Sequence, residues 1–189
     1  MKVRLSRAVA LIGMILLASA VAQAAEIHNG AFAVTMPDGF GAFARQPHSV
    51  NAGIETDTWV AKAPTGEAVV VSVSKMPAKI TDPTKALDST RDSLLKSVKG
   101  TLENEENVQG TLPSRRLTFS SGTAFLTSRL IVDGDRLVNV LYVGRSAEQR
   151  AVPAVAQIFD SFQIAPEAVA EQNPAASDQK TAAATPKVQ

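Results

Sequence analysis

The chain of 189 residues contains no cysteine and only two histidines. Without cysteine there is no disulfide, no thiolate nucleophile and no cysteine-ligated zinc site. A lipid anchor attached through cysteine is excluded for the same reason. His28 and His48 both lie in polar N-terminal segments, far from any buried strand end. We therefore expect neither zinc binding nor histidine-dependent catalysis.

Catalytic signatures are equally scarce. The sequence has no G-x-S-x-G elbow, no P-loop, no G-x-G-x-x-G and no calcium loop. Glu55 and Asp57 alternate with threonines, as in a strand with one wet face. Asp133 and Asp135 suit a hairpin turn better than a cation site. We predict no catalytic residue, no metal and no cofactor, and hence a protein that is not an enzyme, although an enzyme of unfamiliar type stays open.

A second group of carboxylates lies at Glu103, Glu105 and Glu106. These side chains could hold a cation loosely, but a solvated sheet edge explains them better. The formal net charge of the chain is +1, with 19 basic and 18 acidic residues. No basic stripe of the kind that binds nucleic acid is present, so we expect no nucleic-acid partner.

The N-terminus resembles a secretory signal peptide. Lys2, Arg4 and Arg7 precede a short apolar run, and Ala22-Gln23-Ala24 forms an A-x-A cleavage site. Cleavage there would leave Ala25 first, and loss of the three basic residues would change the net charge from +1 to −2. We predict a soluble periplasmic protein that meets the membrane only through this transient segment. An uncleaved membrane anchor is the alternative.

Three segments follow from composition. Residues 1–24 form the predicted signal peptide, and residues 25–165 are long enough for a single domain with its own core. Residues 166–189 are rich in Ala, Pro and Gln and have almost no large apolar side chain. Such a segment buries too little surface to offset its ordering entropy, so we predict a disordered tail.

The stretch from Thr111 to Val143 predicts three consecutive strands. Breaks at Ser121-Gly122 and Asp133-Gly134 predict tight turns, the second of type I′. The third strand is apolar on both faces, with Leu137, Leu141 and Val143 on one side and Val138, Val140 and Tyr142 on the other. A strand with one face in water would alternate apolar and polar residues, and this strand does not. We therefore expect both faces of the sheet to be covered.

The rest of the pattern completes the expected fold. Further strands are predicted at 31–36, 54–61, 68–74 and 161–164, with an acidic edge strand or loop at 102–108. Helices are predicted from Pro83 to about Lys99 and again from Pro153. The prediction is an α+β protein, an α/β/α sandwich with one central, mainly antiparallel sheet of about six strands and a helix layer on each face.

This order of elements resembles the PsbP-like superfamily, which includes the nuclear import factor Mog and bacterial envelope proteins of the DcrB type. The resemblance rests on four stretches, at Phe32–Phe40, Gly110–Arg115, Asp133-Gly134 and Ile158–Phe162. It implies the same sandwich fold and a non-enzymatic accessory or partner-binding role. It implies no site residues, because members of the superfamily bind unrelated partners through different surfaces.

Three arginines are the best candidate contacts for a ligand or partner. Arg115 and Arg116 lie on one predicted strand and Arg129 on the next, so cross-strand pairing would bring them together to hold a carboxylate or phosphate. Pairing with Glu103 to Glu106 is the alternative. Trp59 and Tyr142 are predicted core residues, with an interface role as the alternative.

The function predicted from these observations is a periplasmic accessory or protein-interaction domain with an unknown envelope partner. A periplasmic carrier of a small anionic or apolar ligand is the alternative.

Overall fold

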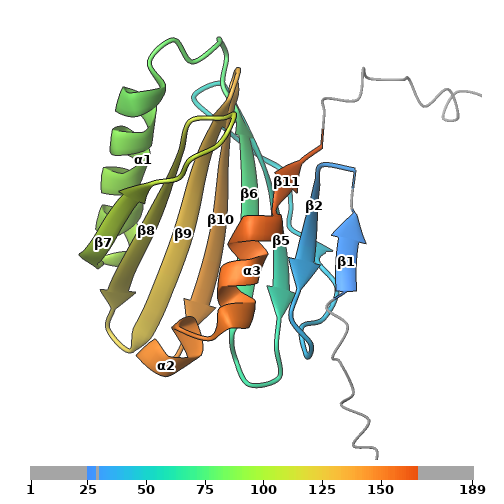
Figure 1. Ribbon diagram of the computed structural model, residues 1–189. Helices are drawn as coiled ribbons and strands as arrows, with labels where there is room; N and C mark the ends of the chain where they lie inside the picture. Colours follow the sequence, from blue (N-terminus) through green and yellow to red (C-terminus); the bar gives the residue numbers. More distant parts are fainter. Residues whose placement is uncertain (1–24, 29, 166–189) are drawn as a thin grey trace, which may run out of the picture.

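The computed structural model describes residues 25–28 and 30–165 (Figure 1). The described part contains three helices and eleven strands, and every strand pair is antiparallel. The predicted signal peptide and the predicted disordered tail lie outside the described residues.

The strands form two sheets. In the large sheet the spatial order is β3 (Ala44–Arg45), β5 (Ile54–Lys62), β6 (Ala68–Lys75), β10 (Arg136–Gly144), β9 (Ala124–Asp133), β8 (Ser114–Ser121) and β7 (Thr101–Asn107), and β4 (Ser49–Asn51) also pairs with β5. In the small sheet the order is β1 (Ala25–His28), β2 (Phe32–Met36) and β11 (Gln163–Ile164). The predicted strands all exist, but the prediction of one sheet is wrong. Alternation along β2 predicts a strand and says nothing about its pairing partner.

The predicted three-stranded meander is present as β8, β9 and β10. Its two turns differ from the prediction by one residue, since the loops are Gly122-Thr123 and Gly134-Asp135. In each loop glycine is the first central residue, with φ of 58° at Gly122 and 65° at Gly134. A glycine there, followed by a residue of negative φ, is typical of a type II′ turn, so the type I′ prediction is wrong.

Both faces of the large sheet are covered, but differently. On one face α1 (Pro83–Val98) contacts β8 and β9, and its Leu87 packs in a cluster with Leu117 and Phe119. On the other face α3 (Pro153–Ser161) shares the cover with β2 of the small sheet. The α+β class is confirmed. The predicted layer of helices alone is not found on this second face, because strands of the small sheet lie beside α3.

The second cluster contains the two residues predicted to be core aromatics. Trp59 and Tyr142 are both buried in it, and Trp59 makes an edge contact with Phe32, with ring centroids 5.4 Å apart. Val138 and Val140 of β10 lie in the same cluster, while Leu137, Leu141 and Val143 pack on the α1 side. The two apolar faces of β10 are therefore confirmed, as is the core role of Trp59 and Tyr142.

Local signals explain how the helices begin and end. Asp82 accepts a hydrogen bond from the backbone N–H of Lys85 and caps α1, which begins at Pro83 as predicted. At the other end Lys99, with φ of 52°, takes the left-handed conformation expected of a glycine. The space beside Gly100 is tight, because a Cβ there would lie 3.1 Å from the Phe119 ring.

The predicted start of a helix at Pro153 is also confirmed. Ser146 caps the short helix α2 (Ala147–Arg150) by accepting a hydrogen bond from the N–H of Gln149, at 3.2 Å. Pro153 then opens α3 at its first turn, where a missing N–H costs nothing. Helix α3 places Val155, Ile158 and Phe159 in the core, whereas α2 buries no residue.

The packing of α3 predicts a difference between two valines. Val155 is 6% exposed in the core, whereas Val152 is 47% exposed at the start of α3. Val155→Ala should lower the free energy of unfolding by about 2 kcal/mol, from two lost methyl groups and the cavity that remains. Val152→Ala should change it by less than about 0.5 kcal/mol. Urea unfolding measures both, and equal losses would contradict this packing.

Candidate functional site

The register of the large sheet separates the three candidate arginines. Arg116 of β8 is paired directly with Arg129 of β9, so these two lie on the face covered by α3. Arg115 precedes Arg116, and successive strand residues point to opposite faces. Arg115 therefore lies on the face covered by α1. The prediction that all three arginines lie together is wrong. It did not take into account that neighbouring residues of a strand point to opposite faces.

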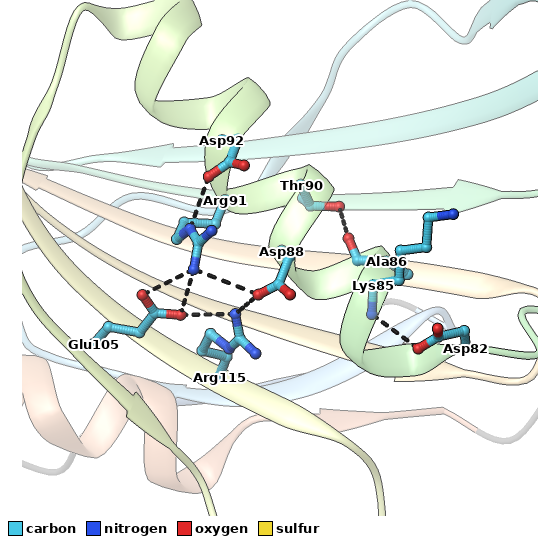
Figure 2. A network of polar contacts seen from close by, with 9 residues as sticks. All are labelled: Asp82, Lys85, Ala86, Asp88, Thr90, Arg91, Asp92, Glu105 and Arg115. Carbon is cyan, nitrogen blue, oxygen red and sulfur yellow. Dashed lines mark hydrogen bonds and ion pairs between the residues drawn. The ribbon is translucent and has the colours of Figure 1, made fainter.

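Arg115 belongs to an ion-pair network beneath α1 (Figure 2). Its Nη1 pairs with Asp88 of α1 and lies 2.7 Å from Oε1 of Glu105 on β7. Arg91 of α1 lies 3.0 Å from the same Glu105 oxygen and pairs with Asp92 at 2.8 Å. The Arg115 side chain is 9% exposed, so its charge is held by protein carboxylates. The network links α1 to β7 and β8 and stabilises the packing of the helix on the sheet.

Arg116 is also paired within the protein. Its Nη2 lies 2.6 Å from Oδ1 of Asp160 on α3, and its Nη1 lies 3.7 Å from Glu106 on β7. The guanidinium also stacks over the ring of Phe159, 5.6 Å from the centroid. Arg116 thus links β7, β8 and α3. The alternative prediction, that the arginines pair with acids between Glu103 and Glu106, is therefore confirmed for two of them. Arg115 pairs with Glu105, and Arg116 pairs with Glu106.

Arg129 differs from the other two. Its Nε donates to Oγ of Ser114 at 3.0 Å, and its Nη1 donates to the carbonyl oxygen of Phe159 at 2.5 Å. That carbonyl belongs to the last turn of α3, where oxygens lack helical partners. Within 25–28 and 30–165, Arg129 has no carboxylate in ion-pair distance. Burial lowers the pKa of Arg129 from its ordinary value, and the charge of Arg116 lowers it further, while the charge of Asp160 partly opposes this shift.

A cavity of about 380 Å³ opens beside Arg129, at the seam between the two sheets. Its lining comes from β9, the start of β10, the loop before β8 and the segment around β11. The lining residues are Gly110, Thr111, Leu112, Arg129, Ile131, Asp133, Arg136, Phe162, Gln163 and Ile164. Arg136 ion-pairs with Asp133 and donates to the carbonyl of Ala165 at 3.2 Å. This cavity is the candidate site.

A second, more open cavity of about 410 Å³ lies on the other side of the same loop. It is lined by Arg115 and by Leu87 of α1, and it shares Gly110, Thr111 and Leu112 with the first cavity. Because Arg115 is already paired with Asp88 and Glu105, this second cavity offers no unbalanced charge. The first cavity is the better candidate for a ligand.

Sequence reasoning found Arg129 but missed Arg136, Phe162 and Ile164. These residues come from segments that meet only because β11 joins the small sheet beside the meander. The spacing of apolar residues along the chain does not indicate that these distant segments come together. One available signal was the Asp133-to-Arg136 spacing, which places opposite charges across the two-residue turn.

The remaining candidates for chemistry have structural roles. His48 hydrogen-bonds to Asp57 at 3.1 Å, and Arg45 pairs with the same carboxylate at 2.6 Å, on the exposed edge of the sheet. Burial raises the pKa of Asp57, but the bonds from Arg45 and His48 outweigh it and lower the pKa. Among the residues the structure describes, no three metal-ligating side chains gather, and no helix is long and apolar enough to cross a membrane.

Comparison with known proteins bears on the fold. Neither protein-family models nor curated protein sequences gave a match. Among solved structures, the solution structure of cyanobacterial PsbP (CyanoP) from Synechocystis sp. PCC 6803 matches with a TM-score of 0.56 and 12% sequence identity. The match covers 78% of this chain and 95% of that chain. The protein therefore has a PsbP-like α+β fold, as the sequence resemblance predicted, and at this identity the likeness concerns the fold alone.

The network around Arg115 predicts a response to acid. The hydrogen bond from Arg115 holds the pKa of Asp88 below its ordinary value of 3.8. A lowered folded-state pKa contributes stability that is complete above about pH 4 and is lost as the pH falls through the folded value. Asp88→Asn should therefore flatten the loss of stability between pH 5 and pH 2, measured by thermal unfolding at each pH.

Asp92→Asn is the matched control, since Asp92 lies on the same helix and pairs with Arg91 rather than Arg115. It should leave most of the acid dependence in place. An acid profile identical in wild type and Asp88→Asn would show that the Arg115 network does not stabilise the fold through this carboxylate.

Proposed function

We propose that this protein is a non-enzymatic accessory protein of the bacterial periplasm that acts by binding a partner protein. The PsbP-like fold and the sequence resemblance to DcrB-type envelope proteins support this role. Lys2, Arg4, Arg7 and the A-x-A site at 22–24 support export with cleavage before Ala25. We also propose the predicted α/β/α arrangement, with a helix layer on each face of the large sheet.

One observation carries the partner-binding role: α1 covers only half of its face of the large sheet. It contacts β8 and β9, and Figure 1 shows it on the β7–β8 side, away from β5 and β6. On the uncovered half, Val70 lies opposite Leu141 of β10, which packs against the α1 cluster. Val60 and Val70 are half-buried and belong to neither core cluster. We call this uncovered half the open face.

The open face has the composition of an interface core. From Thr56 to Val60 on β5 and from Val70 to Ser74 on β6, the residues that point to this side include no charge. The hydroxyls of Thr56 and Ser74 share a hydrogen bond at 2.9 Å, and those of Thr58 and Ser72 share one at 3.2 Å. Depletion of charge marks the centre of protein interfaces, and paired hydroxyls reduce the cost of removing water.

The dimensions favour a helix as the occupant. Adjacent strands lie about 4.8 Å apart, so β10, β6 and β5 together span about 10 Å, close to the diameter of one helix. A partner's amphipathic helix beside α1 would complete the helix layer on this face. Its apolar stripe would contact Val60, Val70 and Leu141.

The test is site-specific photo-crosslinking in the cell. A photoreactive residue at Val70 should give one discrete adduct, whereas the same residue at Val50, which is 64% exposed on β4, should not. Adding Ser72→Glu should lower the Val70 adduct at least about tenfold, because a buried unpaired charge opposes binding. Thr101→Glu on exposed β7 should not lower it. An adduct insensitive to Ser72→Glu, or equal yields at positions 70 and 50, would rule out the open face.

A second candidate function is a periplasmic carrier of a small ligand, favoured by the cavity beside Arg129. The open face and this cavity lie on opposite faces of the large sheet. The two candidate functions can therefore be tested independently.

A further inference from the structure

We propose that the cavity between the two sheets binds a small organic monocarboxylate with an apolar tail, held by the guanidinium of Arg129. The inference rests on the carrier function just described and names its ligand class. The same chemistry is presented by a free carboxylic acid and by the C-terminal carboxylate of a peptide. Charge, free donors and wall composition each support it.

The charged groups of the lining leave one positive charge unbalanced. Arg136 is paired with Asp133, so these two cancel. Arg129 keeps its charge without a carboxylate in ion-pair distance within 25–28 and 30–165. Asp160 favours this charge only from beyond ion-pair distance. A partly buried cation without a directly paired carboxylate is costly, and a bound anion would lower that cost. The cavity therefore favours a ligand with a single negative charge.

Arg129 also keeps hydrogen-bond donors for that anion. A guanidinium has five N–H groups. Two of them bond to Ser114 and Phe159, and the described residues supply no acceptor for the Nη2 group. Arg129 is half-buried and lines the cavity, so this group is available to a ligand there. An N–H of Nη2 can donate a charge-assisted hydrogen bond to a carboxylate oxygen.

The bonds to Ser114 and Phe159 fix the guanidinium in place before a ligand arrives. Nε is held by a residue of β8 and Nη1 by the end of α3, so the plane of the group is set from two sides. A side chain already ordered loses little conformational freedom on binding. The two contacts that hold Arg129 in the fold thus also fix the position of its unbonded Nη2 group, to which an anion can bind.

The remaining walls determine the rest of the ligand. Leu112, Ile131, Phe162 and Ile164 supply apolar surface. The volume of about 380 Å³ is near the lower end of small-molecule sites, which begin at about 300 Å³. Because Arg136 is already paired with Asp133, the lining offers no second positive charge for a second carboxylate. The site therefore fits a compact monocarboxylate better than a dicarboxylate.

The experiment is a titration of the mature protein by heteronuclear NMR with benzoate and hexanoate, against benzamide and hexanamide. The acids should bind at least about tenfold more tightly than the amides, because only the acids carry a negative charge to pair with the guanidinium. Backbone shifts should concentrate at Gly110–Leu112, Ile131 and Phe162. Equal affinity of acids and amides, or shifts confined to other regions, would overturn the proposal.

Variants separate the site from general effects. Arg129→Gln should weaken acid binding at least about tenfold, whereas Arg116→Gln, its cross-strand neighbour outside the cavity lining, should not. Because Arg129 also bonds to Ser114 and Phe159, Arg129→Gln could unfold the protein. Thr111→Trp narrows the cavity from an exposed position and leaves those bonds intact. It should abolish acid binding, and unchanged binding by Thr111→Trp would contradict the site.

A final pair of probes distinguishes the source of the carboxylate. An acetylated Gly-Ser-Ala-Phe peptide with a free C-terminus is compared with its C-terminal amide. Tighter binding of the free peptide than of benzoate supports a peptide terminus, and the reverse supports a free acid. If neither class binds, the carboxylate site and the carrier function both fail. The partner-binding proposal is then unaffected, because crosslinking from Val70 tests it on the opposite face.

Discussion

The fold depends on β10, a strand with apolar side chains on both faces. Val138, Val140 and Tyr142 pack under α3 and the small sheet, while Leu137, Leu141 and Val143 pack on the α1 side. Such a strand is stable in water only when both faces are covered. The seam beneath the second cover contains the cavity, and the incomplete first cover leaves the open face. Both candidate sites therefore follow from how β10 is buried.

Local patterns in the sequence were enough to predict most elements. The meander, the start of α1 and the break at Pro153 each depend on residues close in the chain. The sheet of β2 and β11 was not predictable in this way, because its pairing depends on contacts between segments about 130 residues apart. The left-handed conformation of Lys99 was also missed, since glycine is the residue expected at such a position and here it comes one residue later, at Gly100.

The candidate site was predicted only in part, for a similar reason. Residue type identified three arginines, but the alternation of strand residues separates Arg115 from Arg116 and Arg129. Carboxylates from α1, β7 and α3 then balance Arg115 and Arg116. Arg129 alone lacks such a partner among the described residues, and no local pattern signals that difference. It emerges only when the end of α3 and Ser114 are placed beside β9.

The central claim is that the protein acts by binding a partner rather than by catalysis. Its most direct test is native mass spectrometry of the protein released from the periplasm after mild crosslinking. We expect a chain that begins at Ala25 in a complex with one further protein, and a bare chain for the Ser72→Glu variant. A bare wild-type chain, or a complex unchanged by Ser72→Glu, would contradict it.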